Sequence, residues 1–335
     1  MAGDSSWLIY ALGGGWGHLT RAVSLAQAAE PHHKVRILTN SPYVAPVWKT
    51  MPELDLISLD PKLDFATARD RTIQQIVIAD AVCLIVDTFP RGLGGELAPL
   101  FKSLRAIRVL VHRDLSPRYV AQGGLRNFVR SAYDLVLIPG EDEATAFASL
   151  PLAVVTAPWL VRNPPRNRKP RRRRRILVCA SGYANELPWY AAVVSCLRAL
   201  DSNVDVRCVA PVCPPGCPRE YWVAHWPASD LFAAADVVIG GAGYNTIREC
   251  VAGQVPLIAR PWPRKYDRQW LRAQRAAKTG GVTIVQEPTE AARAAIDQIK
   301  RARPPQARTE VRNGAAEAVD IIESVMENRV ARVGQ

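Results

Sequence analysis

Two glycine-rich stretches hold the side chains best suited to chemistry, and the first of them ends in a histidine. Residues 13–18 read GGGWGH, directly after an apolar run and before a segment with helical spacing at 19–29. An imidazole at the start of a helix can take a proton from a hydroxyl near neutral pH, and the positive helix end lowers its pKa. His18 is therefore a candidate general base, and a loop histidine hydrogen-bonded to backbone is the alternative.

This first stretch does not fit a dinucleotide-binding loop. The G-x-G-x-x-G pattern that begins at Gly13 requires glycine where the chain has His18. The next expected strand ends in Thr39 and Asn40, where NAD- and FAD-binding proteins place an acidic residue for the ribose. Both departures argue against a nicotinamide or flavin, and no cofactor is expected.

The second stretch, residues 240–246 with the sequence GGAGYNT, has the features of a phosphate-binding turn. A strand is expected before it and a helix from about Asn245, so that free amides at the helix start suit a diphosphate. Glu249 follows one turn into this helix, where its carboxylate could hold both hydroxyls of a ribose. The alternative is a capping box, in which Thr246 and Glu249 only satisfy donors at the helix end.

The second stretch resembles the donor motif of GT-B glycosyltransferases, in particular the MurG-like family that makes the glycan of lipid II. In that family a glycine-rich turn and a helix bind the nucleotide, and a helix glutamate holds the ribose. The matching residues are Gly241, Gly243, Asn245, Thr246 and Glu249. A later K-D-R-Q segment of the family touches the donor sugar. This chain has a similar segment made of Lys265, Asp267, Arg268 and Gln269, which Tyr266 interrupts. The resemblance implies that Asp267 and Gln269 contact the donor sugar.

The first stretch resembles related families with one departure. MurG-like enzymes have G-G-x-G-G-H-x-x-P, whereas this chain has a G-x-G-H-x-x-R form made by Gly15, Gly17, His18 and Arg21. That form resembles the nucleotide-sugar hydrolase of pseudaminic acid synthesis. The resemblance implies that His18 activates a hydroxyl or a water molecule, and it groups Gly15 and Gly17 with the donor-binding residues.

A carboxylate is expected to orient a histidine base. Asp87 ends the apolar run VCLIVD and is the first candidate, and Asp114, in VHRDLSPR, is the second. Either could instead cap a helix. Ser181 closes the run ILVCAS and is expected to contact the donor diphosphate.

Apolar runs that alternate with helical segments must position these residues. Strands separated by helices and apolar throughout indicate parallel sheets covered on both faces. The expected fold is α/β, with two Rossmann-like doubly wound domains in tandem, as in GT-B proteins. The expected boundaries are an acceptor-side domain (1–160), a basic linker (161–175), a donor domain (176–312) and a helix (313–335) that packs back on the first domain. The expected strands are 7–12, 35–39, 55–59, 82–86, 107–112, 135–138, 176–180, 204–210, 221–224, 236–240, 255–259 and 282–285.

The net charge of +12 is concentrated in one segment of the 335-residue chain. Residues 162–175 hold nine basic residues and no acidic one, so 12 − 9 leaves +3 for the rest. The segment is a solvated linker or, through Arg171–Arg175, a contact for an anionic membrane surface. It lacks interleaved aromatic residues, which argues against nucleic acid. No apolar run is long enough to span a membrane and no signal peptide is evident, so a cytoplasmic protein is expected, peripheral on the membrane if the arginines bind it.

The seven cysteines are expected to be free thiols in a reducing compartment, and Cys213 and Cys217 could also bind a metal or form a disulfide.

The predicted function is a glycosyltransferase that needs no metal ion and moves a sugar from a nucleoside-diphosphate sugar, with UDP favoured, to an acceptor hydroxyl activated by His18. One alternative is a nucleotide-sugar hydrolase in which His18 activates water. A second is a non-catalytic subunit that binds nucleotide sugars.

Overall fold

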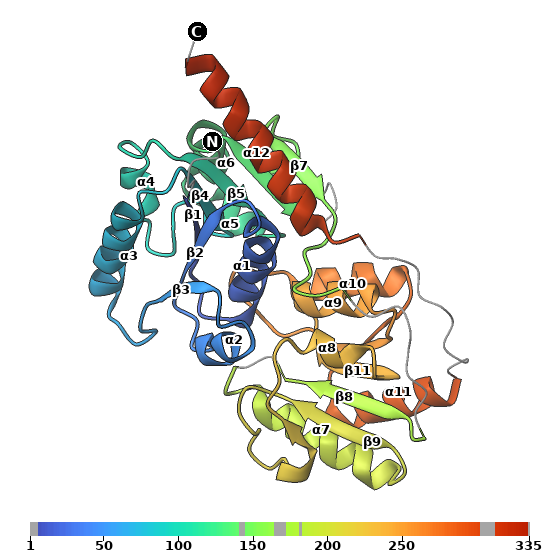
Figure 1. Ribbon diagram of the computed structural model, residues 1–335. Coiled ribbons are helices and arrows are strands. Elements are labelled where there is room, and N and C mark those ends of the chain that lie inside the picture. Colours follow the sequence, from blue (N-terminus) through green and yellow to red (C-terminus); the bar gives the residue numbers. More distant parts are fainter. Residues whose placement is uncertain (1–5, 141–144, 164–171, 181–182, 302–311, 334–335) are drawn as a thin grey trace. The chain divides into compact units, whose positions relative to one another are not determined.

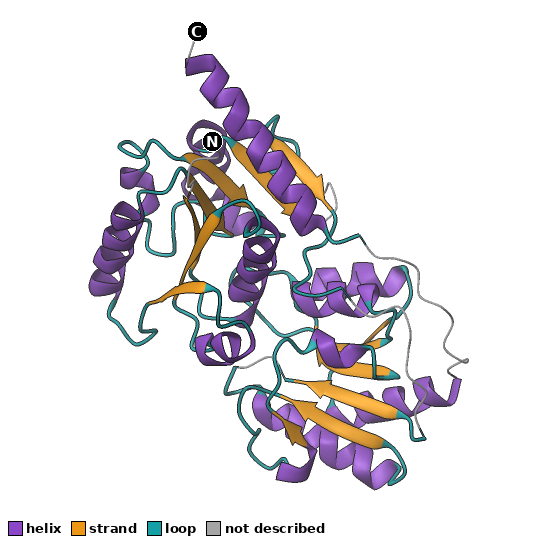
Figure 2. Cartoon of the chain, in the orientation of Figure 1, coloured by secondary structure: helices purple, strands orange, loops and turns teal. Residues whose placement is uncertain are grey.

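The chain divides into two compact units, each built on its own parallel sheet. The computed structural model describes residues 6–140, 145–163, 172–180, 183–301 and 312–333. Unit 1 comprises Met1–Val161 and Arg312–Gln335, and unit 2 comprises Arg162–Val311. Figure 2 shows helices packed against the strands of each unit. The expectation of two α/β domains with all-parallel sheets is confirmed.

Unit 1 has a seven-stranded sheet in the order β3-β2-β1-β4-β5-β6-β7. Apart from Ser6 at the start of the first strand, the strands at 6–11, 83–87 and 135–139 are fully buried, which explains why they read as continuous apolar runs. The strands are β1 (Ser6–Ala11), β2 (Lys34–Thr39), β3 (Asp55–Ser58), β4 (Cys83–Asp87), β5 (Ile107–Val111), β6 (Leu135–Pro139) and β7 (Ala153–Thr156). The helices are α1 (Trp16–Ala29), α2 (Val44–Thr50), α3 (Phe65–Ala79), α4 (Leu97–Leu100), α5 (Pro117–Ala121), α6 (Leu125–Ala132) and α12 (Gly314–Val333), with a 3-10 turn at Gln122–Gly124.

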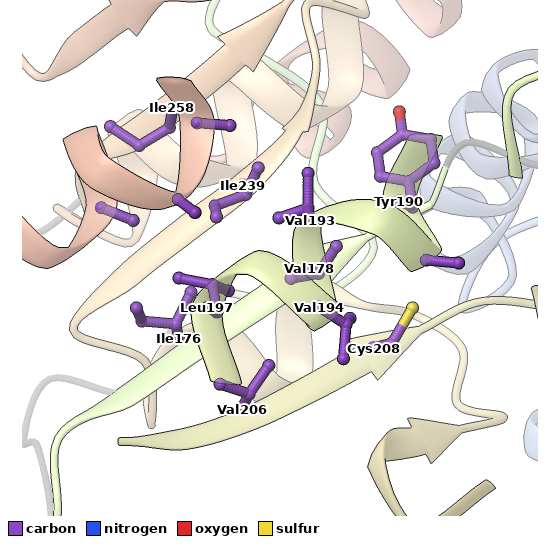
Figure 3. Packing of buried hydrophobic residues seen from close by; sticks show 14 of the residues in the cluster. Ile176, Val178, Tyr190, Val193, Val194, Leu197, Val206, Cys208, Ile239 and Ile258 are labelled. Atoms are coloured by element: carbon purple, nitrogen blue, oxygen red, sulfur yellow. The ribbon is translucent and has the colours of Figure 1, made fainter. Parts of the chain in front are cut away.

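Unit 2 has a six-stranded sheet in the order β10-β9-β8-β11-β12-β13. The strands are β8 (Arg175–Cys179), β9 (Asp205–Val209), β10 (Trp222–Val223), β11 (Val237–Gly241), β12 (Leu257–Arg260) and β13 (Val282–Ile284). The helices are α7 (Leu187–Leu200), α8 (Ser229–Phe232), α9 (Tyr244–Ala252), α10 (Gln269–Lys278) and α11 (Pro288–Arg301), with a 3-10 turn at Arg219–Tyr221. In Figure 3, Val193 and Leu197 of α7 pack over Ile176 and Val178 of β8, and burial of this apolar surface holds the unit together.

Three local expectations differ from the structure. Strand β7 was not expected, because its four residues are largely half-exposed and form no long apolar run. The first helix begins at Trp16 rather than at residue 19, so His18 lies in its first turn and not in the loop. Glycine at position 17 costs little there, since the first amides of a helix have no partner within it. Arg175 is the first residue of β8 and not the end of a linker.

Helix α12 belongs to unit 1, although it follows unit 2 in the chain. It contacts α1, β6 and β7, and Figure 1 shows it beside β7. A Cβ at Gly314 would lie 2.1 Å from the carbonyl oxygen of Ala157, so only glycine permits this approach. The amide nitrogen of Leu160 donates to Asn313 Oδ1 at 3.1 Å, and Glu323 pairs with His33 at 2.7 Å. The C-terminal helix is thus fixed to unit 1 at both ends of this contact.

The basic segment is partly neutralised where the structure describes it. Arg174 pairs with Asp236 at 2.9 Å, and Arg175 pairs with Asp205 at 2.5 Å. Residues 164–171 lie outside the described part, so Arg172 and Arg173 are the described arginines of the run that remain exposed and without a described ion pair. None of the described helices combines the length and apolar character needed to cross a bilayer.

Cys213 and Cys217 are free thiols, and the Cys213 thiol donates to the carbonyl of Cys217 at 3.4 Å. Within the described ranges, no three His, Cys, Asp or Glu side chains gather as the ligands of a metal ion would.

Candidate active site

The carboxyl ends of β1 and β4 bring His18 and Asp87 into contact in unit 1. His18 Nδ1 lies 2.5 Å from Asp87 Oδ2, although the two residues are 69 positions apart in the chain. Both are buried, with 8% of the His18 side chain and 2% of the Asp87 side chain exposed. Of the two carboxylates expected to orient the histidine, Asp87 therefore makes the contact. Asp114 is buried after β5.

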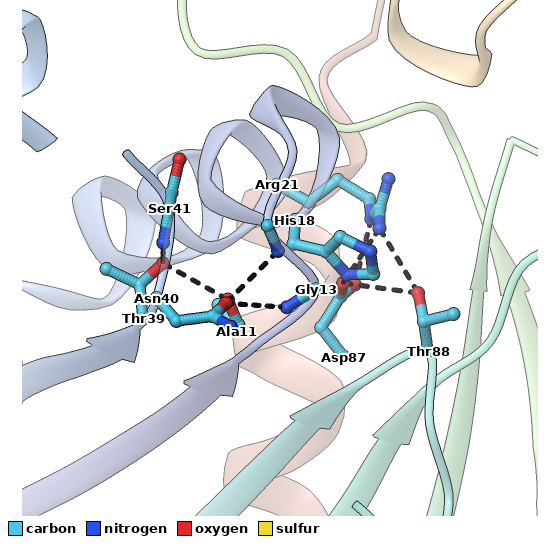
Figure 4. A network of polar contacts seen from close by, with 10 residues as sticks. Ala11, Gly13, His18, Arg21, Thr39, Asn40, Ser41, Asp87 and Thr88 are labelled. Carbon is cyan, nitrogen blue, oxygen red and sulfur yellow. Dashed lines mark hydrogen bonds and ion pairs between the residues drawn. The ribbon is translucent and has the colours of Figure 1, made fainter. Parts of the chain in front are cut away.

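Arg21 completes this cluster from the next turn of α1. Its Nε and one terminal nitrogen donate to the two oxygens of Asp87, at 2.8 and 2.7 Å, in a bidentate pair. Figure 4 shows the imidazole and the guanidinium meeting at the Asp87 carboxylate, with Thr88 beside them. The Thr88 hydroxyl accepts from Arg21 and donates to Asp87, both at 3.2 Å. Thr88 also has a φ of +75°, a strained conformation for a β-branched residue, of a kind found at functional sites.

The charges in this cluster fix the state of the imidazole. Burial alone would raise the pKa of the Asp87 carboxyl, but Arg21 and His18 outweigh it and lower this pKa well below its usual value. Burial lowers the pKa of His18 below its usual 6.5, and Arg113 and Arg21 add to this effect against the opposing influence of Asp87. The expected direction is thus found, but burial rather than the helix end is its main cause. At neutral pH, Asp87 is ionised and His18 is neutral.

This protonation state assigns the two ring nitrogens of His18. Because Asp87 is an ionised acceptor, His18 Nδ1 carries the hydrogen and donates to it. Nε2 is then left with a lone pair that can accept a proton. The imidazole therefore has the tautomer and fixed orientation of a general base.

The glycine loop makes room for this ring. A Cβ at Gly13 would lie 2.4 Å from both Cδ2 and Nε2 of His18, so a larger residue would displace the imidazole. Asn40 Oδ1 accepts from the amides of Gly13 and Gly14, at 2.9 and 3.1 Å, and so ties the loop to the end of β2. Gly15 is the N-cap of α1 and Gly17 lies in its first turn.

The second glycine stretch joins β11 to α9 in unit 2. Gly240 and Gly241 end β11, and Gly243 is the N-cap of α9 in an extended conformation. Asn245 and Thr246 follow within the first turn, where backbone amides lack partners inside the helix. A helix start of this kind suits an anion such as a diphosphate.

The capping-box alternative for Thr246 and Glu249 is wrong. The N-cap is Gly243, so Thr246 is the third helical residue and cannot cap the helix. Glu249 lies in the second turn, close to Asp230 and Cys179. Burial, together with the smaller effect of the nearby Asp230 carboxylate, raises the pKa of Glu249 to about 8. Glu249 is thus a protonated carboxyl at neutral pH, able both to donate and to accept hydrogen bonds.

The loop before α10 uses Asp267 and Gln269 to hold itself in place. Asp267 Oδ1 pairs with Arg272 at 2.7 Å, and both side chains are buried. Gln269 Oε1 accepts from the amide nitrogen of Trp262 at 3.0 Å. Trp262 in turn contacts Tyr190 and lies next to Gly241. The two predicted sugar contacts therefore support the loop that approaches the second glycine stretch. Ser181 lies outside the described residues.

The segment that carries the second glycine stretch matches a known family. Residues 226–325 match the glycosyltransferase family 28 C-terminal domain. This match includes Gly241, Gly243, Glu249 and Asp267. We call residues 226–325 the family 28 segment. No curated protein has a sequence that matches the chain.

Solved structures share the fold over almost the whole chain, at low sequence identity. Staphylococcus aureus MnaA with UDP has a TM-score of 0.64 and 12% identity, covering 99% of this chain and 98% of its own. The Streptomyces sp. SF2575 glycosyltransferase SsfS6 with thymidine diphosphate has a TM-score of 0.62 and 15% identity, covering 96% of this chain and 99% of its own. Acinetobacter baumannii MurG has a TM-score of 0.57 and 13% identity, covering 96% of this chain and 99% of its own. The predicted GT-B fold is confirmed, and together with the family 28 segment it supports a glycosyltransferase.

Reasoning from sequence missed most of the groups that hold His18. Arg21 stood out only as part of a motif, and its contact with Asp87, 66 positions later in the chain, has no local signal. Thr88 and Asn40 were visible only as residues after strand ends. The one signal that could have found them is topological, because residues that follow neighbouring parallel strands gather at one edge of the sheet.

Proposed function

We propose that the protein is a glycosyltransferase that moves a sugar from a nucleoside-diphosphate sugar to an acceptor hydroxyl. The observation that carries this proposal is the buried contact of His18 with Asp87, which leaves Nε2 of a neutral imidazole ready to take a proton. The family 28 segment supports a sugar transfer as the reaction that uses this base.

In the proposed step, the acceptor hydroxyl gives its proton to His18 Nε2. The acceptor oxygen attacks the anomeric carbon of the donor sugar and forms the new glycosidic bond. The bond from that carbon to the diphosphate oxygen breaks, and its electron pair leaves with the nucleoside diphosphate. Asp87 stabilises the imidazolium that forms, and Arg21 keeps the Asp87 carboxylate ionised and in place.

We place the donor on unit 2. The diphosphate binds the amides at the start of α9, with Gly241 and Gly243 allowing close approach, and Glu249 binds the ribose. UDP and thymidine diphosphate, which accompany MnaA and SsfS6, are the first nucleotides to consider. The charge of the leaving diphosphate is offset by these amides, so the reaction is proposed to need no metal ion.

The experiment is an assay of nucleoside-diphosphate release with a panel of UDP- and dTDP-sugars, chosen by the rise in thermal stability that each causes. We expect release to depend on an acceptor, to persist in EDTA and to be lost in His18→Ala. The matched control is Trp48→Ala, an exposed residue of unit 1. Release that is as fast without an acceptor as with one would contradict the transferase and favour the hydrolase. Unchanged turnover in His18→Ala would remove His18 from the mechanism.

A further inference from the structure

The structure also bears on the chemical class of the acceptor. This inference rests on the proposed function. Four aromatic side chains follow the ends of four neighbouring strands in unit 1. Trp16 follows β1, Tyr43 follows β2, Phe89 follows β4 and Tyr119 lies after β5. The strands are parallel and adjacent in the order β2-β1-β4-β5, so their carboxyl ends share one edge of the sheet. His18 lies at this same edge, in the first turn of α1.

The rings form ordered pairs at this edge. Trp16 and Tyr43 stack with centroids 4.5 Å apart and ring planes only 4° from parallel. Phe89 stacks on the His18 imidazole at 5.6 Å, and Tyr119 meets Phe89 edge-on at 6.3 Å. Trp16, Tyr43 and Tyr119 are all half-buried, so each residue keeps part of its surface exposed. Phe89 thus contacts the His18 ring directly, and Trp16, which stacks on Tyr43, lies two residues before His18 in the chain.

The polar side chains of β2 and β4 at this edge already have structural partners. Asn40 binds the glycine loop, and Thr39 binds the carbonyl of Ala11 and the amide of Ser41. Ser41 accepts from the amide of Tyr43, and Thr88 binds Arg21 and Asp87. An aromatic ring needs chiefly apolar and stacking contacts, which the four side chains supply.

We propose that the acceptor is a planar aromatic alcohol, a phenol, bound by the rings of Trp16, Tyr43, Phe89 and Tyr119 with its hydroxyl at His18. These four residues are then positioning and specificity residues for the transfer. The hydroxyl proton passes to His18, and the phenolic oxygen takes the sugar as the nucleoside diphosphate leaves.

The acid–base chemistry agrees with this choice. Burial lowers the pKa of His18, so the imidazole is a weaker base than usual. A phenol has a pKa of about 10, as in tyrosine, whereas bulk water has a pKa of about 15.7. A weak base therefore accepts the proton of a phenol far more readily than the proton of water.

The test compares different acceptors, each supplied with the same donor sugar, which the release assay selects. The phenols are 7-hydroxycoumarin and 4-nitrophenol, and the non-aromatic alcohols are cyclohexanol and methyl glucoside. We expect transfer to the phenols at a kcat/KM at least tenfold higher. We expect Trp16→Ala to raise the acceptor KM about two- to tenfold with the donor KM unchanged, since one stacking contact is lost. Trp16→Phe should restore most of the affinity, and Trp48→Ala, which removes an exposed tryptophan of the same unit, should have no effect.

Binding of 7-hydroxycoumarin, followed by its own fluorescence, makes the same comparison without turnover. Equal binding to Trp16→Ala and Trp48→Ala, or none to the wild type, would overturn the proposal. So would a preference for methyl glucoside or cyclohexanol, although the transferase itself would stand. Nucleoside-diphosphate release that no acceptor accelerates would instead refute the proposed function, and the acceptor class with it. Thermal melting of each variant shows whether a lost signal reflects unfolding.

Discussion

His18 is held by a carboxylate that is itself held by an arginine, and this order of contacts decides what each residue does. Arg21 binds both oxygens of Asp87, and Asp87 in turn orients the imidazole. A salt-bridged carboxylate with a lowered pKa stays charged over the whole physiological range. The proposed role of His18 as a base is therefore controlled by the titration of His18 itself, which occurs below pH 6.5.

We predict that Asp87→Asn lowers kcat by about 10²- to 10⁴-fold, because an amide no longer selects the Nδ1–H tautomer of His18. For the wild type, kcat/KM should decline only as the pH falls below 6.5, through the lowered pKa of His18. The measurement is the pH–rate profile of both proteins. Asp114→Asn is the comparison, because Asp114 is a similarly buried carboxylate that makes no described contact with His18. A larger loss in that variant than in Asp87→Asn would reverse the assignment.

Glu249 gives a second prediction, on stability. Its pKa is about 8 in the folded protein against a usual 4.5, so between these values the folded state holds a proton that the unfolded state releases. The free energy of unfolding should therefore fall as the pH rises from 4.5 to about 8, by at most about 1.4 kcal/mol for each pH unit in this range. Glu249→Gln should lack this decline. Denaturant melts of both proteins at pH 5, 7 and 9 measure it, and parallel stabilities would contradict the raised pKa.

At the scale of elements, the loop between β12 and α10 is stabilised by a buried ion pair. We predict that Asp267→Asn destabilises the protein by about 3–5 kcal/mol, because it removes the carboxylate that pairs with the buried charge of Arg272. The double variant Asp267→Asn with Arg272→Met should recover much of this loss. Thermal or denaturant melts measure it. If Asp267 served only to bind the donor sugar, its replacement would raise the donor KM and leave the melting temperature unchanged.

Membrane binding through Arg171–Arg175 stays a prediction at this scale too. Arg174 and Arg175 are paired within unit 2, so the described charge that remains is that of Arg172 and Arg173. We expect weak pelleting with anionic liposomes that salt abolishes and that the double replacement of Arg172 and Arg173 by Gln reduces. Pelleting that neither change affects would exclude attraction through these arginines.

The elements themselves were predictable where burial is two-sided. Strands such as Leu8–Ala11 and Val237–Ile239 are buried on both faces, so a continuous apolar run identified them. The half-exposed β7 gave no such run. The start of α1 was misplaced because Gly17 is a poor helix former, and nothing local shows that it occupies the first turn, where that preference has little weight. The cluster around Asp87 depends on long-range contacts that spacing along the chain cannot reveal.

For the whole molecule, α12 determines whether unit 1 is complete. We predict that a chain ending at Val311 loses the stability of unit 1, because it uncovers the apolar surface now buried against Val319 and Ile322. Circular dichroism melts and limited proteolysis measure this loss. The control is a chain ending at Arg329, which removes the exposed Val330 and the residues after it. Equal resistance of the full chain and the Val311 truncation would show that α12 adds little.

The hydrogen bonds between Leu160 and Asn313 have a consequence for how the protein could be rebuilt. They join the residue just before the chain leaves unit 1 to the residue just after it returns. In design terms, unit 2 is an insert whose two splice points are neighbours, the arrangement that best tolerates domain exchange. A short linker could rejoin them and leave unit 1 alone, with its His18 base intact. Under the proposed function, a foreign donor-binding domain could equally replace the insert and change the donor sugar without altering unit 1.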